Sequence, residues 1–176
     1  MHEEKLKTLL VDDEAPIRNI LIDILEDMPL EIVQASDGVE AWELFQKEKF
    51  DLVITDIHMT NMNGLDFAEK AIKRDYSVPI LVITAFDDKD RILRALQIGI
   101  YDFITKPVVD EFLIDRVQRA IDKRRLVKAE SQIIDILHEM MSIPNEQCLE
   151  SMNLQERLDY IHQLVTIVSI KGERGR

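Results

Sequence analysis

The segment LVITD at residues 52–56 decides the fold, because a continuous run of apolar and β-branched residues ends on a carboxylate. A run without polar alternation is typical of a strand that is buried on both faces. Such strands occur in parallel sheets that helices cover on each side. The segment therefore predicts an α/β fold, with Asp56 at the carboxyl end of a buried strand.

Four other short runs extend this pattern through the first two-thirds of the chain. They are apolar and β-prone, and they lie at residues 8–11, 32–35, 80–83 and 103–105. Helical segments separate them, so strand and helix alternate. This alternation predicts right-handed crossovers and one doubly wound, five-stranded parallel sheet.

Start and stop signals place the intervening helices. Pro16 suits the first turn of a helix that runs to about Asp27. Asn63 and Gly64 open a later helix, and Gly99 is the residue expected just beyond the end of another. These signals support the alternation of strands and helices.

Polar side chains follow the predicted strands at their carboxyl ends, where ligands bind in sheets of this kind. They are Asp12, Asp13, Asp56, Thr84 and Lys106. Clustered carboxylates raise one another's pKa or bind a cation, and oxygen ligands select a hard ion such as Mg²⁺. A carboxylate can also attack phosphorus, while a metal and a lysine neutralise the phosphoryl oxygens. The pattern predicts a site for a divalent cation and a phosphoryl group on an aspartate.

Each of these residues has a structural interpretation when it is taken alone. An aspartate at a strand end commonly serves a turn or a cap, and Lys106-Pro107 is a common strand terminator. Phe103, three residues before Lys106, fits a core position equally well. The joint occurrence of the polar residues, in this order, favours a functional site.

Five ordered motifs resemble the receiver domain of bacterial two-component response regulators. They are LVDDE at 10–14, TDIHM at 55–59, MNG at 62–64, Thr84-Ala85 and Lys106-Pro107. The resemblance covers about residues 5–122 and implies a flavodoxin-like fold with strand order 2-1-3-4-5. It also implies a phosphoprotein that responds to a sensor histidine kinase.

The same resemblance implies roles for the acidic residues. Asp56 would be the phosphoacceptor. Asp12 and Asp13 would hold Mg²⁺ together with Asp56 and the backbone carbonyl of His58.

Further roles follow for residues on the later strands. Thr84 and Lys106 would contact the phosphoryl group, and Phe103 would be the aromatic residue that reorients when Thr84 moves. Thr60 departs from the family pattern, which usually has proline there, so the loop after Asp56 has a less restricted backbone.

Composition limits the class of protein. The 176 residues are 46% hydrophobic and 32% charged, which is compatible with a buried core. The net charge of −12 argues against general binding to nucleic acid or anionic membranes. We find one cysteine, Cys148, no signal peptide and no apolar run long enough for a membrane span. A cytoplasmic protein is the expectation.

The last third of the chain has a different pattern. Residues 110–141 contain neither Pro nor Gly, so the fifth helix is predicted to continue beyond a receiver domain at 1–122. After a break at 143–145, apolar residues recur at heptad spacing: Leu154, Leu158, Ile161, Val165 and Val168. These features predict a helical hairpin at 123–176 that forms a homodimer or binds a partner. The basic residues at 123–125 and Lys128 are interpreted as a solvated helix face.

The resulting hypothesis is a signalling switch whose phosphorylation changes protein–protein contacts. A substrate-turning enzyme is not indicated, although the receiver would catalyse its own phosphotransfer and dephosphorylation. One alternative is a phosphorelay component that passes phosphate through His138, a residue that also fits an ordinary helix position. Another is an N-terminal fragment of a longer regulator that has an output module.

Overall fold

The computed structural model describes residues 5–85 and 89–141, together with residues 155–156, 159–160 and 162–163. The chain divides into two compact units, Met1–Arg124 and Arg125–Arg176. The first unit contains the sheet and every residue that the sequence assigns to the phosphoryl and metal site.

One parallel sheet of five strands forms the centre of the first unit, in the order β2-β1-β3-β4-β5. The strands are β1 (Leu6–Val11), β2 (Leu30–Ala35), β3 (Leu52–Asp56), β4 (Ile80–Ala85) and β5 (Asp102–Lys106). All five residues of β3 are buried, as the unbroken run at 52–55 predicts. The predicted fold class and strand order are confirmed.

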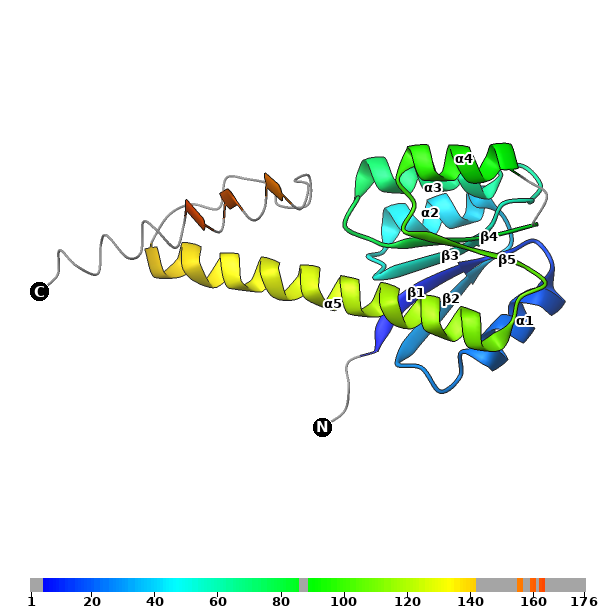
Figure 1. Ribbon diagram of the computed structural model, residues 1–176, viewed down its shortest axis with the longest axis horizontal. Coiled ribbons are helices and arrows are strands. Elements are labelled where there is room, and N and C mark those ends of the chain that lie inside the picture. The colour runs from blue at the N-terminus through cyan, green and yellow to red at the C-terminus, as the bar shows by residue number, and fades with distance from the viewer. Residues whose placement is uncertain (1–4, 86–88, 142–154, 157–158, 161, 164–176) are drawn as a thin grey trace, which may run out of the picture. The chain divides into compact units, whose positions relative to one another are not determined.

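Helices cover both faces of this sheet (Figure 1). They are α1 (Ala15–Ile24), α2 (Gly38–Lys47), α3 (Gly64–Arg74), α4 (Lys89–Ile98) and α5 (Asp110–Met141). Buried residues of α1 and of the first turns of α5 pack on one face, and those of α2, α3 and α4 pack on the other. Each buried leucine, isoleucine or phenylalanine of these layers contributes roughly 1.5–3 kcal/mol of transfer free energy.

The helix ends agree with the sequence signals, with one difference. Pro16 lies in the first turn of α1, and Gly99 has a φ of +87° just after α4. Helix α1 ends at Ile24, so the prediction that it continues to about Asp27 is wrong. Pro29 follows closely and disfavours helical geometry in the residue before it, so the chain turns before β2 begins.

Helix α5 continues to Met141, which confirms the predicted long helix. Of the predicted hairpin, the break at 143–145 and the five heptad residues lie outside the described residues. Within the described ranges, no helix is both long and apolar enough to cross a membrane.

A polar cluster closes the amino edge of the sheet. The Nε atom of Arg124 donates to Asp51 Oδ1 at 3.2 Å, and one of its terminal nitrogens donates to Ser77 Oγ at 2.6 Å. The second oxygen of Asp51 accepts the backbone N–H of Lys7 at 3.2 Å. The side chains of Arg124 and Asp51 are only 11% and 14% exposed. The interpretation of Arg124 as part of a solvated face is therefore wrong.

Candidate functional site

The carboxyl edge of the sheet brings two buried aspartates and a lysine together. Val11 lies opposite Thr55 in the β1–β3 register, so Asp12 and Asp56 follow at the same level. They are 1% and 2% exposed. Lys106, at the end of β5, places its ammonium 2.9 Å from Asp56 Oδ1 and 3.9 Å from Asp12 Oδ2.

The environment shifts the pKa of two of these groups. Burial raises the pKa of the Asp12 carboxyl above its ordinary value, an effect that the hydrogen bond from the Glu14 N–H opposes and the charge of Asp56 increases. Burial acts to lower the pKa of Lys106, but the carboxylates of Asp56 and Asp12 outweigh it and the net shift is upward. Lys106 therefore carries its positive charge at neutral pH.

Each inner carboxylate has one oxygen bound to the backbone and one oxygen left open. Asp12 Oδ1 accepts the Glu14 N–H at 2.8 Å, and Asp56 Oδ2 accepts the His58 N–H at 2.9 Å. Asp12 Oδ2 and Asp56 Oδ1 are buried, and among the described residues they have no partner other than the Lys106 ammonium, which forms ion pairs with both oxygens. Open, anionic oxygens are the ligands that Mg²⁺ prefers, so the two side chains fit a divalent cation.

The structure gives less support to the other predicted metal ligands, Asp13 and the His58 carbonyl. Asp13 is exposed, although its charge contributes to the raised pKa of Asp12. Across the described part of the chain, no three His, Cys, Asp or Glu side chains are grouped to hold a metal ion. The His58 ring lies against Arg91 of α4, with 2.6 Å between a guanidinium nitrogen and Nδ1. The metal roles of Asp13 and of the His58 carbonyl stay predictions.

Helix α3 approaches the Asp56 backbone very closely. A Cβ added to Gly64 would lie 1.8 Å from the Asp56 carbonyl oxygen, which leaves room for glycine alone. The Gly64 N–H also donates to the Ile57 carbonyl at 3.1 Å. The sequence marks Gly64 as a helix start, but its packing against Asp56 depends on the tertiary fold and was not predicted.

Thr84 and Phe103 lie on neighbouring strands. Thr84 is fully buried, and its hydroxyl donates to the Ala85 carbonyl at 3.3 Å. In the β3–β4 register Asp56 lies opposite Ile83, so Thr84 is one residue beyond it. Phe103 is partly buried and packs against the core under α2, α3 and α4. The structure therefore places Thr84 at the site edge and Phe103 beside the core.

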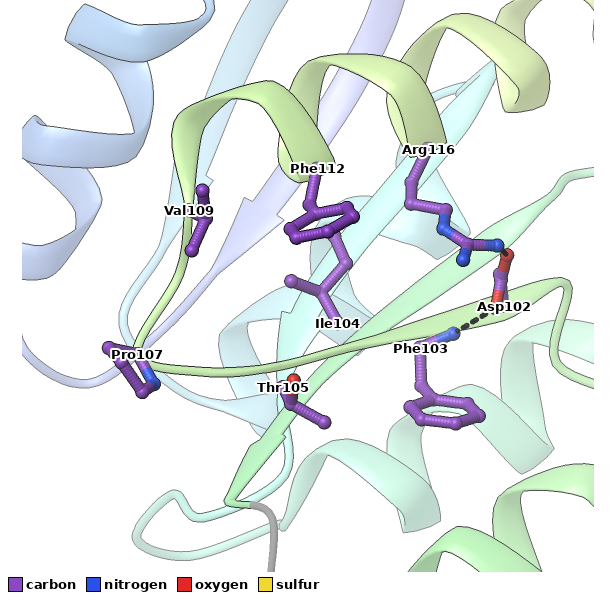
Figure 2. Close-up of a pocket in the computed structure, with 8 residues that line it drawn as sticks. All are labelled: Asp102, Phe103, Ile104, Thr105, Pro107, Val109, Phe112 and Arg116. Atoms are coloured by element: carbon purple, nitrogen blue, oxygen red, sulfur yellow. Dashed lines mark hydrogen bonds and ion pairs between the residues drawn. The ribbon is translucent and has the colours of Figure 1, made fainter.

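A groove of about 270 Å³ runs along the outer edge of β5 (Figure 2). Its lining comes from β5 and the start of α5: Asp102, Phe103, Ile104, Thr105, Pro107, Val109, Phe112 and Arg116. Phe112 is exposed, and Arg116 forms an ion pair with Asp102. Figure 2 shows Phe103 on the opposite side of the strand from Phe112. No local sequence pattern predicts this groove, because it forms between separate elements.

The sheet order and the acidic carboxyl edge define a flavodoxin-like α/β receiver module. Residues 8–118 match the family described as response regulator receiver domain, and the chain belongs to this family. One relative, a protein-glutamate methylesterase/protein-glutamine glutaminase of Pyrococcus horikoshii, is 44% identical over 107 residues, which are 58% of this chain and 29% of that protein. The probable transcriptional regulator ycf27 of Guillardia theta is 39% identical over 127 residues, 72% of this chain and 49% of that protein.

A solved structure gives the same result. The signal receiver domain of an HD domain-containing protein from Pseudomonas fluorescens Pf-5 superposes with a TM-score of 0.68 at 25% identity, covering 72% of this chain and 94% of that one. The match reaches no more than half the length of the two curated relatives. The two relatives have different names, a methylesterase/glutaminase and a probable transcriptional regulator, and neither name describes this chain as a whole.

Proposed function

We propose that the protein is a two-component response regulator in which a histidine kinase phosphorylates Asp56 in the presence of Mg²⁺. The observation that carries the proposal is the pair of open, buried carboxylate oxygens, Asp12 Oδ2 and Asp56 Oδ1, beside the charged Lys106. Two buried carboxylates that face one lysine carry an excess of negative charge, which a bound cation would offset.

We assign one task to each group. Asp56 Oδ1 attacks the phosphorus atom, an O–P bond forms, and the bond from phosphorus to the donor nitrogen breaks with its electron pair leaving on nitrogen. Lys106 is 2.9 Å from that oxygen and neutralises charge on the transferred group. Asp12, Asp13, Asp56 and the His58 carbonyl would hold Mg²⁺, which when bound would balance the phosphoryl charge.

The response starts with Thr84. Its hydroxyl donates to the Ala85 carbonyl at 3.3 Å, and an anionic phosphoryl oxygen is a stronger acceptor. Rotation of Thr84 toward Asp56 would change the packing next to Phe103 and the groove along β5. Phosphorylation would thus shift a conformational equilibrium of the surface formed by α4, β5 and α5.

The output is a change in protein–protein contact, and no turnover of a separate substrate is involved. Leu126 and Ile133, both beyond Arg124 on α5, are exposed large apolar side chains. The two side chains are seven residues apart, so they lie on the same face of α5, which a partner helix could cover. The simplest partner is a second copy of the chain.

Intact-protein mass spectrometry tests the phosphorylation. Wild type incubated with Mg²⁺ and a small phosphodonor should gain one phosphoryl group, whereas Asp56→Asn should gain none. Absence of the adduct in wild type, or an equal adduct in Asp56→Asn, would contradict the assignment.

Light scattering tests the output. Beryllofluoride with Mg²⁺ should change the molar mass of wild type, and the double variant Leu126→Ala/Ile133→Ala should stay monomeric. Ile20→Ala removes an exposed apolar side chain from α1 and is the matched control. A molar mass that beryllofluoride leaves unchanged in wild type would overturn the proposed output.

A further inference from the structure

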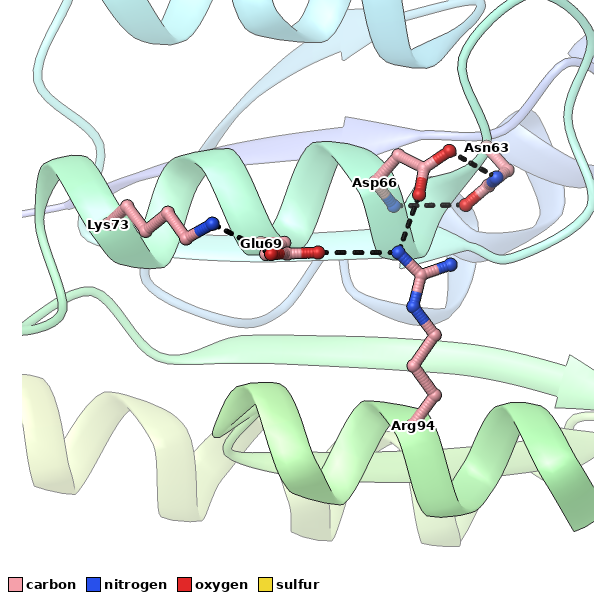
Figure 3. Close-up of polar contacts among 5 residues, drawn as sticks. All are labelled: Asn63, Asp66, Glu69, Lys73 and Arg94. Carbon is pink, nitrogen blue, oxygen red and sulfur yellow. Dashed lines mark hydrogen bonds and ion pairs between the residues drawn. The ribbon is translucent and has the colours of Figure 1, made fainter.

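Helix α4 is tied to helix α3 by one arginine (Figure 3). Arg94 donates through one terminal nitrogen to Asp66 Oδ1 at 2.7 Å and to Glu69 Oε2 at 3.3 Å. Lys73 holds the other oxygen of Glu69 at 2.7 Å. Two carboxylates on α3 thus converge on one cation from α4.

Apolar packing of α4 is thin by comparison. Among the described side chains of α4, at residues 90–98, Ala95 alone is buried. Leu93 and Leu96 are 58% and 56% exposed. Helix α3 buries five of its residues. A polar tether therefore has more weight in positioning α4 than it would have in a well-buried helix.

The tether continues to the phosphoacceptor strand. Asn63 accepts the Asp66 N–H at 2.9 Å and donates from its side chain to Asp66 Oδ2 at 2.6 Å. The two oxygens of Asp66 therefore serve two structures, the loop after β3 and helix α4. Gly64, the next residue, lies directly against the Asp56 carbonyl. An unbroken series of contacts thus links the backbone of Asp56 to Arg94.

We propose that Arg94 is a positioning residue that latches α4 onto α3 and sets how readily α4 shifts when Asp56 is phosphorylated. The latch is a property of the unphosphorylated protein, and its effect on signalling rests on the proposed function. It differs from the route through Thr84 and Phe103, because it runs through the α3 side of the site. Removing it raises the population of the shifted form of α4.

Hydrogen exchange measured by mass spectrometry tests the latch without phosphate. Arg94→Ala should speed amide exchange at residues 90–98 about threefold, the effect of losing a partly exposed ionic network. Arg94→Lys should give a smaller increase than Arg94→Ala, because lysine keeps the positive charge, although it presents it as a single point charge. Arg119→Ala, which removes an exposed ion pair with Asp115 on α5, is the control and should leave α4 unchanged. Unchanged exchange of α4 in Arg94→Ala would overturn the proposal.

A double-variant cycle distinguishes the loss of the contact between Arg94 and Asp66 from a general loss of stability. Asp66→Asn keeps groups that can bond to Asn63 but removes the charge that faces Arg94. In that background Arg94→Ala should add less than about half of its effect in wild type. A full additive effect would show that Arg94 does not act through Asp66 and would overturn the proposed link from Asp56 to α4.

The link to signalling has a separate readout. Arg94→Ala should accept phosphate from a small phosphodonor about twofold to fivefold faster than wild type, because more of it occupies the shifted form. If neither protein is phosphorylated, the proposed function fails while the exchange data still decide the latch. If both are phosphorylated at equal rates, the latch has no role in phosphorylation and the proposal is wrong on that point.

Discussion

Each edge of the sheet pairs largely buried carboxylate groups with a basic side chain, but the two clusters differ in how completely their charges are paired. At the amino edge, Arg124 and Asp51 form a mostly buried ion pair in which both Asp51 oxygens have donors. At the carboxyl edge, Lys106 faces two buried carboxylates, and one oxygen of each has no other partner among the described residues. The first cluster is balanced and holds α5 on the sheet. The second has an excess of negative charge, which favours the binding of a cation.

This difference distinguishes the edge that stabilises the domain from the edge that can bind a ligand. Burying an unpaired carboxylate destabilises a fold unless a ligand compensates it. Buried carboxylates with excess negative charge indicate a binding site. A matched ion pair of similar burial indicates a contact that stabilises the fold. Variants that alter one edge at a time should therefore have different effects.

Gly64→Ala should have the largest effect. The new Cβ would need space that the Asp56 carbonyl occupies at 1.8 Å, so α3 must move away from β3. We expect the free energy of unfolding, measured by urea denaturation, to fall by more than about 3 kcal/mol. Gly99→Ala is the matched control: it has open space but a positive φ, and it should lose about 1 kcal/mol. Equal losses in the two variants would argue against the close contact at Asp56.

Arg124→Ala should come next. It removes the Arg124 cation from a mostly buried Asp51 carboxylate and a hydrogen-bond donor from Ser77, so we expect a loss of about 2–3 kcal/mol in the same assay. Arg119→Ala removes an exposed ion pair from the same helix and should lose less than about 0.5 kcal/mol. A similar small loss in Arg124→Ala would mean that the amino-edge cluster contributes no more than a surface pair.

Asp12→Asn should have the smallest effect and the opposite sign. Because the native pKa of Asp12 is raised above 3.8, the stability that this group contributes is complete below that pH and is lost as the pH rises through the native pKa. Neutralising the side chain should therefore raise the free energy of unfolding at pH 7 by about 1 kcal/mol in the absence of divalent cations.

The advantage of Asp12→Asn should shrink as the pH falls through the native pKa of Asp12, because the wild-type carboxyl then becomes protonated. Asp13→Asn alters an exposed neighbour and should have little effect. A loss of stability in Asp12→Asn at pH 7 would contradict the view that the carboxyl edge carries uncompensated charge.

Local patterns and strand-end positions predicted much of this molecule. The buried run before Asp56, the Gly99 helix end and the length of α5 follow from periodicity and from single residues with strong conformational preferences. The meeting of Asp12, Asp56 and Lys106 follows from the topology, since parallel strands end at one edge.

The contacts that the sequence did not predict join residues that are far apart in the chain. In the sequence, Arg124 is one of several basic helix residues, and its partner Asp51 lies 73 positions earlier. The packing of Gly64 and the pairing of Arg94 with α3 likewise require the relative placement of separate elements. No local pattern carries that information, so these residues could be found only in the structure.

The most direct test of the comparison is the dependence of Tm on Mg²⁺ in wild type, Asp12→Asn and Arg124→Ala. A ligand that binds the native state raises Tm with its concentration. We predict that Tm rises on Mg²⁺ addition in wild type and, from a lower starting point, in Arg124→Ala, while Asp12→Asn starts higher and shows little further rise. An equal Mg²⁺-dependent rise in Asp12→Asn, or none in wild type, would contradict the claim that the open oxygens at the carboxyl edge form a cation site.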